Sequence, residues 1–73
     1  AMMHEIKNKL DLGEKVELEC VDVEGYKKRN PDPKWSVLNL DKIIVTSVQY
    51  AAVSIKDANV ALMCYELRHF KIK

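Results

Sequence analysis

The chain has 73 residues and a formal net charge of +1, with 48% of its residues apolar and 32% charged. This length allows a single domain, residues 1–73, with a small core, and the apolar fraction is too high for a disordered chain. No apolar run approaches the roughly 18 residues that can cross a bilayer, so we expect no membrane partner.

The chain begins with Ala1 before Met2, and we interpret Ala1 as a remnant of tag removal. No long apolar stretch follows Met2, so we expect no export signal and a cytoplasmic location. The two cysteines, Cys20 and Cys64, are too few for the disulfide framework of a small secreted domain. We therefore expect both to be reduced and mostly buried.

Acidic and basic residues are unevenly distributed along the chain. Residues 1–24 carry seven acids and three bases, whereas residues 25–73 carry four acids and nine bases. A net charge near zero therefore hides a dipolar layout, which suits an anionic partner or a head-to-tail contact between copies.

Residues 2–12 have the pattern of a short amphipathic helix. Met3, Ile6 and Leu10 recur at three- and four-residue spacing with polar residues between them. Gly13 is suited to end this helix because it adopts the left-handed conformation without a Cβ clash. A helix of this length is marginal alone and must dock on the rest of the domain.

Residues 15–23 are predicted to form the first strand. Apolar residues alternate with Glu17 and Glu19 from Val16 to Cys20, which is the period of a half-buried strand with a polar outer face. The phase shifts by one residue after Cys20, and either a bulge or burial on both faces would account for it.

Residues 25–34 are predicted to form a stiff basic loop. Asn30-Pro31 and Asp32-Pro33 each restrict the residue before proline to extended conformations. The segment and its border gather cations, which can contact phosphate, and flat rings, which can stack on bases. These candidate binding residues are Tyr26, Lys27, Lys28, Arg29, Lys34 and Trp35. The alternative is a solvated loop whose two aromatic residues anchor its ends in the core.

The remaining residues are predicted to form short strands joined by tight turns. β-branched residues favour strand over residues 42–48, and alternation favours it over residues 52–56 and 68–72. Residues 35–40 and 60–63 complete the set, residues 56–59 suit a hairpin turn, and residues 64–67 fit either strand or a helical turn.

The predicted fold is mainly β: a small, five-stranded, strongly bent barrel with one short N-terminal helix. The run from Ile44 to Asp57, followed by Leu62-Met63-Cys64-Tyr65 and Phe70-Lys71-Ile72, resembles the strand rhythm of SH3-like small barrels and, loosely, of Sm-like proteins. The resemblance covers residues 43–72 and implies a ring-forming RNA binder. The segment from Gly25 to Trp35 departs from the family pattern, and no functional residue of the family is transferred.

The residue pattern gives little support for a catalytic site or a metal site. The chain has no Cys-x-x-Cys pair and no glycine-rich phosphate loop, so we expect no metal and no cofactor. Strand alternation would place Cys64 and Glu66 on one face and His69 on the other, which argues against a nucleophile–base pair.

We therefore expect a non-enzymatic binding module. The leading hypothesis is binding of RNA or single-stranded nucleic acid through the basic, aromatic-flanked loop. The alternative is a protein-interaction or self-assembling module that binds no nucleic acid.

Overall fold

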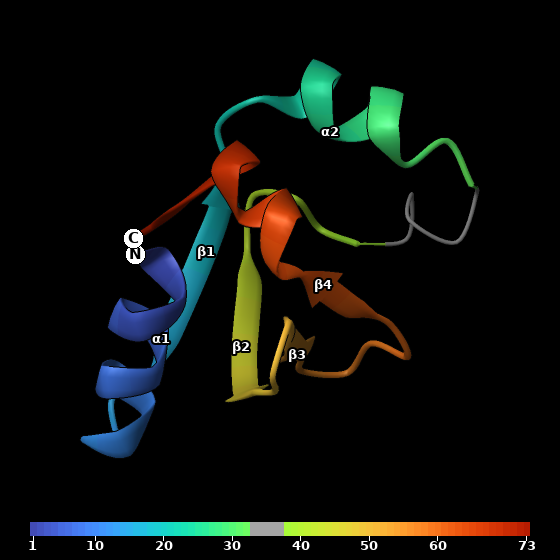
Figure 1. The fold of residues 1–73 in the computed structure, drawn as a ribbon. Coiled ribbons are helices and arrows are strands. Elements are labelled where there is room, and N and C mark those ends of the chain that lie inside the picture. The colour runs from blue at the N-terminus through green and yellow to red at the C-terminus, as the bar shows by residue number, and fades with distance from the viewer. Residues whose placement is uncertain (33–37) are drawn as a thin grey trace.

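The computed structural model describes residues 1–32 and 38–73 (Figure 1). Five strands form one antiparallel sheet in the order β4-β3-β2-β1-β5. The strands are β1 (Val16–Cys20), β2 (Ile43–Val48), β3 (Ala52–Ile55), β4 (Ala61–Met63) and β5 (Phe70–Ile72). The helices within residues 1–32 and 38–73 are α1 (Met2–Asp11), α2 (Val23–Arg29) and the 3₁₀ helix η2 (Cys64–His69). The predicted mainly β class and the N-terminal helix are confirmed.

Helix α1 ends as the sequence predicts. Gly13 adopts φ +79°, its N–H donates to Leu10 O, and the N–H of Glu14 donates to Lys9 O at 3.0 Å. This pair of bonds is a Schellman motif, which satisfies carbonyls that the helix end would leave unpaired. Ile6 of α1 is fully buried against the sheet, so the helix docks as its length requires.

The core lies on one face of the central strands. Val16 and Leu18 of β1 pair with Val45 and Ile43 of β2, and all four are at most 3% exposed. Alternate residues of β1 point outward, which confirms the predicted two-residue period from Val16 to Cys20. The buried cluster also takes in residues from the helices α1, α2 and η2 and from strands β1, β3, β4 and β5: Ile6, Cys20, Tyr26, Val53, Ile55, Leu62, Leu67 and Phe70.

The sheet has two edges, β4 and β5. Within residues 1–32 and 38–73, β4 pairs only with β3, and β5 pairs only with β1. The predicted closure into a barrel is therefore not seen in the strand pairing.

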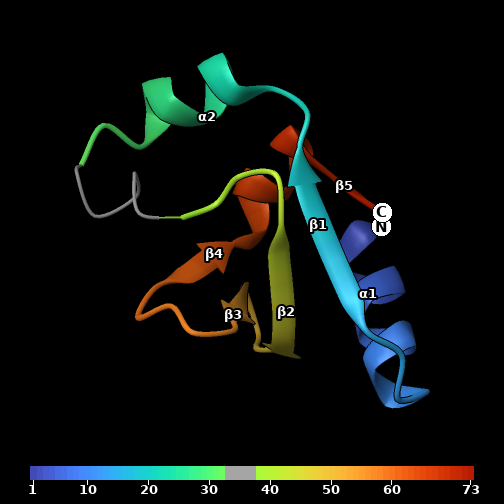
Figure 2. The same ribbon diagram turned by 180° about the vertical axis from the view of Figure 1, so that it is seen from behind.

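The main correction concerns residues 21–29. The predicted first strand ends at Cys20 rather than at residue 23, and α2 occupies Val23–Arg29, where a loop was expected. Figures 1 and 2 show α2 crossing the end of the sheet at which β1 stops. Since Val21 and Val23 are 58% and 40% exposed, neither a bulge nor two-sided burial explains the phase shift after Cys20.

Smaller differences lie in the second half of the chain. Residues 38–40 form no strand, while residues 35–37 lie outside the described part. The hairpin turn at 56–59 is confirmed, with Asp57 at φ +58°. Residues 64–67 are helical, within η2. Both cysteines are free as expected, but only Cys20 is buried and Cys64 is exposed.

Candidate functional site

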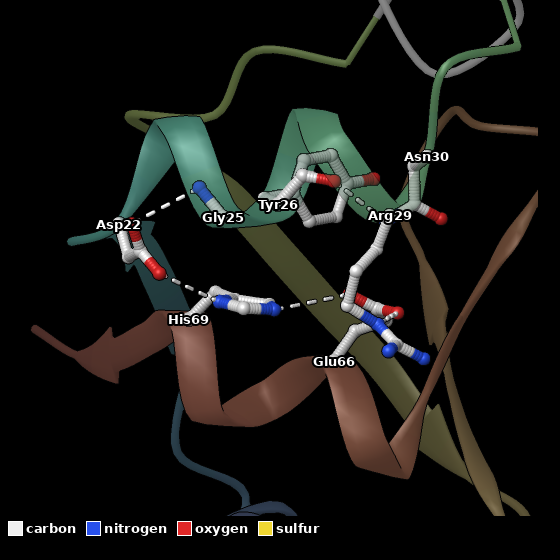
Figure 3. Close-up of polar contacts among 7 residues, drawn as sticks. All are labelled: Asp22, Gly25, Tyr26, Arg29, Asn30, Glu66 and His69. Atoms are coloured by element: carbon white, nitrogen blue, oxygen red, sulfur yellow. Dashed lines mark hydrogen bonds and ion pairs between the residues drawn. The ribbon is translucent and has the colours of Figure 1, made fainter.

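Helix α2 is held at its start by the Asp22 side chain. Asp22 Oδ1 accepts a hydrogen bond from Gly25 N at 3.1 Å, which caps the helix (Figure 3). A Cβ atom at residue 25 would overlap the Asp22 carboxylate in this orientation. Glycine at position 25 therefore provides the space that the capping carboxylate occupies.

The same carboxylate reaches His69 at the end of η2. Asp22 Oδ2 lies 3.1 Å from His69 Nδ1, and the other ring nitrogen, Nε2, lies 3.5 Å from Glu66 Oε2 (Figure 3). Since an ionised carboxylate only accepts, Nδ1 carries the proton in the bond to Asp22. The pKa of Asp22 is lowered by the Gly25 N–H and by His69.

Glu66 is a buried carboxylate that joins η2 to the other end of α2. Its Oε1 accepts from Arg29 Nε at 3.0 Å and its Oε2 from Asn30 Nδ2 at 3.1 Å, while its side chain is only 5% exposed. Asn30 Nδ2 also donates to Tyr26 O at 2.9 Å. A buried charge is tolerated when it is paired and hydrogen-bonded, and Glu66 meets both conditions.

Tyr26 lies in the core rather than on the surface. Its ring is 1% exposed and meets Phe70 edge-on, with centroids 5.5 Å apart. Burial raises the pKa of Tyr26 to about 12. The predicted stacking role does not fit this position, and the alternative, that Tyr26 anchors its segment in the core, does.

The three consecutive cations at the end of α2 differ in whether they form an ion pair. Lys27 and Lys28 are exposed and form no ion pair with any residue of 1–32 and 38–73. Arg29 is 45% exposed at its side chain, is bonded to Glu66, and has its guanidinium 5.3 Å from the ring centroid of Tyr65. That distance is in the range of cation–π contact. Tyr65 is 51% exposed, so α2 and η2 bring an accessible aromatic ring beside the cations.

Two of the predicted binding residues, Lys34 and Trp35, lie outside the described residues. The residues that the sequence analysis missed are Tyr65 as the aromatic partner and Glu66 with His69 as the support. Strand alternation placed Glu66 and His69 on opposite faces, whereas the 3₁₀ turn brings them to one side. The available signal for α2 was Asp22 as an N-cap followed by cations in the last turn.

The acidic residues of β1 already have partners within the chain. Glu17 pairs with Lys73 at 2.8 Å and Glu19 with Lys71 at 3.1 Å. The acidic strand and the basic C-terminal residues therefore neutralise each other. Among the cations of α2, Lys27 and Lys28 have no such acidic partner in the described residues.

His69 contacts two carboxylates in the described residues. Cys64 is exposed on η2, while His69 is buried between Asp22 and Glu66. Within residues 1–32 and 38–73, no group of three or more His, Cys, Asp or Glu side chains is placed to hold a metal ion. The Asp22–His69–Glu66 contacts connect α2 to η2, and this is a positioning role.

Comparison of the chain with known protein families, with curated proteins and with solved structures finds no match. None of the helices in the described residues combines the length and the apolar character needed to span a membrane.

Proposed function

We propose that the protein is a non-enzymatic module that binds RNA or single-stranded nucleic acid through the end of α2. The observation that carries this proposal is the exposure of Lys27 and Lys28, without acidic partners in the described residues, beside the Arg29–Tyr65 pair. Cations contact phosphates, and an exposed ring offers a base a surface for stacking.

The anchoring of α2 favours this function. Tyr26 is fixed in the core and Glu66 bonds both Arg29 and Asn30, so the last turn of α2 has a fixed position. A fixed set of cations loses less conformational entropy on binding than the same cations on a free loop. Arg29 bonds Glu66 through Nε, which leaves its terminal nitrogens to reach a phosphate.

The fold proposal accompanies the functional one. We propose that the chain is a small barrel of SH3-like, loosely Sm-like type, whose sheet curves so that β4 and β5 approach one another. The support is the order of elements: a helix, then antiparallel strands with β5 beside β1, and a 3₁₀ turn before the last strand. Such a family relationship would agree with RNA binding.

A salt titration of binding to a labelled random oligonucleotide tests the proposal. We expect Lys27→Ala/Lys28→Ala to weaken binding at low salt by about tenfold or more and to reduce the salt slope by about 1.4, or 0.7 for each lost contact to a single strand. The matched control is Lys7→Ala/Lys9→Ala, which removes the same charge from α1, where each lysine pairs with an exposed acid. Equal losses in both double variants would mean that only net charge matters, and the proposed site would be wrong.

The ring of Tyr65 provides a second arm of the same test. Tyr65→Ser should cost about 1–3 kcal/mol of binding free energy if a base stacks there. Tyr50→Ser is its control, because Tyr50 is fully exposed in the turn between β2 and β3. An unchanged affinity for Tyr65→Ser would remove stacking from the proposal.

Self-assembly is the second candidate, and the two sheet edges favour it. An edge strand presents unpaired backbone groups that a strand of another copy can bond. Beside β4 lie the exposed side chains of Met63, Cys64 and Tyr65. The acidic outer face of β1 is a weaker interface, since Glu17 and Glu19 are paired internally.

Light scattering at two protein concentrations tests this candidate. If β4 is the contact, the mass should exceed that of the 8.4 kDa chain and should fall when Met63→Lys places a charge on the edge. Leu12→Lys, at a residue 76% exposed at the end of α1, should leave the mass unchanged. A mass of one chain at both concentrations would exclude self-assembly in that range.

A further inference from the structure

A pocket of about 740 Å³ opens between the segment leading into β2 and the turn that joins β3 to β4. Its described lining includes Leu38, Ile44 and Val60, each partly buried, together with the buried Ile43 and Ile55. Pockets that bind small molecules range from about 300 to 1,000 Å³ and are lined mostly by apolar side chains. Figures 1 and 2 show the turn between β3 and β4 well away from α2.

Three lysines from three separate segments line this pocket. Lys15 precedes β1, Lys42 precedes β2 and Lys56 follows β3, and all three are exposed. None of them forms an ion pair with any other residue of the described ranges. Asp57 is the one acid among the described lining residues, so the lining carries an excess of positive charge.

Glu17, an acid that interacts with two of these lysines, is already bonded to Lys73. Glu17 has a lowered pKa, chiefly because it bonds Lys73, with smaller contributions from Lys42 and Lys15. Its carboxylate lies 2.8 Å from Lys73 Nζ. The charges of Lys15 and Lys42 are thus not cancelled by a direct internal contact, and an anion entering the pocket would meet them.

Two side-chain amides add hydrogen-bonding capacity at the pocket. Asn39 Oδ1 accepts from Asp41 N at 3.0 Å, so the Asn39 side chain has a fixed position and its amide nitrogen has no partner in the described residues. Asn59 also lines the pocket and is exposed. Amides can bond the edge of a heterocyclic base, which carries both donors and acceptors.

We propose that this pocket binds a nucleoside phosphate, with the base against Ile44 and Val60 and the phosphate among Lys15, Lys42 and Lys56. Inorganic phosphate would leave the apolar lining unused. An uncharged aromatic compound would leave the lysines unused. A free mononucleotide and one nucleotide of a strand both present this chemistry, and the experiments below distinguish the two sources. The inference does not rest on the proposed function, because it uses no residue of α2.

Titration of the folded protein with AMP and with UMP, followed by amide chemical shifts, tests the proposal. We expect saturable shifts that concentrate at residues 38–44 and 55–60. Adenosine alone and inorganic phosphate alone should each bind at least about tenfold more weakly, because each satisfies half of the site. Equal affinity for inorganic phosphate, or no saturable shifts at millimolar ligand, would overturn the proposal.

Two variants test the two halves of the site separately. Lys42→Gln/Lys56→Gln should weaken AMP binding by about tenfold or more by removing two positive charges, and Val60→Ala should weaken it by removing apolar contact with the base. Lys27→Ala/Lys28→Ala is the control and should leave AMP binding unchanged. A failure of the pocket proposal can therefore be distinguished from a failure of the proposed binding site on α2. Amide spectra of each free variant check that the fold is kept. Full AMP affinity in a folded Lys42→Gln/Lys56→Gln variant would overturn the assignment.

A competing oligonucleotide distinguishes the source of the nucleotide. If a short single strand displaces AMP and loses affinity in Lys42→Gln/Lys56→Gln, the pocket holds one unit of a strand. If AMP binds and the strand does not displace it, the ligand is the free nucleotide.

Discussion

Glu66 is the residue on which the geometry of the candidate site depends most. It is buried, it accepts from Arg29 and Asn30, and it faces His69, so it joins η2 to the end of α2. The sequence alone gives little reason to select it, because its nearest partner on α2 lies 37 residues away.

Removing the Glu66 carboxylate should destabilise the fold. Glu66→Ala leaves a buried cavity and removes the carboxylate that accepts hydrogen bonds from Arg29 and Asn30, so we expect a loss of about 2–4 kcal/mol in the free energy of unfolding. Urea unfolding measures the loss. Glu24→Ala, at an exposed acid in the first turn of α2, is the matched control and should cost less than about 1 kcal/mol. Equal costs for the two variants would show that the Glu66 contacts contribute nothing.

At the level of single residues, the sequence predicted which residues are charged but not which residues contact one another. The exposed cations Lys27 and Lys28 were found from composition alone, and they remain candidates. The aromatic residues beside them were predicted to be Tyr26 and Trp35. Tyr26 is buried, Trp35 lies outside the described residues, and the exposed ring that contacts Arg29 is Tyr65. A local pattern cannot reveal which of two tyrosines a distant segment will cover.

Helix α2 is an element that depends on its cap and on docking. It has only seven residues, which is too short to be stable alone, and its N-terminus is fixed by Asp22. Asp22 also bonds His69, so the cap and the contact with η2 share one carboxylate.

Because the Asp22 carboxylate makes both contacts, we expect the stability of the folded state to depend on pH in the acidic range. The native pKa of Asp22 lies below its ordinary value of 3.8, so the folded state holds the proton less tightly than the unfolded chain. The stabilisation that Asp22 provides is therefore complete at a pH above its ordinary pKa. It is lost as the pH falls through the lower pKa of Asp22 in the folded state. Asp22→Asn keeps a cap but cannot titrate, so its unfolding midpoint in urea should fall less between about pH 6 and about pH 3.

Glu17→Gln provides the comparison, because the pKa of Glu17 is also lowered, mainly by Lys73. Each variant should remove part of the acid sensitivity. An Asp22→Asn protein with the full acid sensitivity of the parent would show that Asp22 does not contribute.

The elements that could be predicted are those that local patterns determine. Alternation located β1, β-branched residues located β2, and Gly13 marked the end of α1. α2 was missed because Gly25 and the Asn30-Pro31 pair are typical of loops, while the forces that make it helical come from η2. The general rule is that tertiary contacts override weak local propensity in short elements.

At the scale of the whole molecule, the dipolar charge layout is largely cancelled by folding. β5 lies beside β1, so Lys71 and Lys73 meet the acids of the first strand. The charges that remain without internal partners in the described residues include the lysines of α2 and those of the pocket. The net charge of +1 therefore understates how basic these two surfaces are.

The pairing of β1 with β5 also orders events during synthesis. β1 is synthesised before β5, and the residues that pair with β1 include Ile72, which pairs with Leu18. Until that residue leaves the exit tunnel, one side of β1 has no strand to bond, and contacts so distant in sequence form slowly. A nascent chain therefore carries an open strand edge on β1 until β5 has emerged, and chaperone contact is most valuable in that interval.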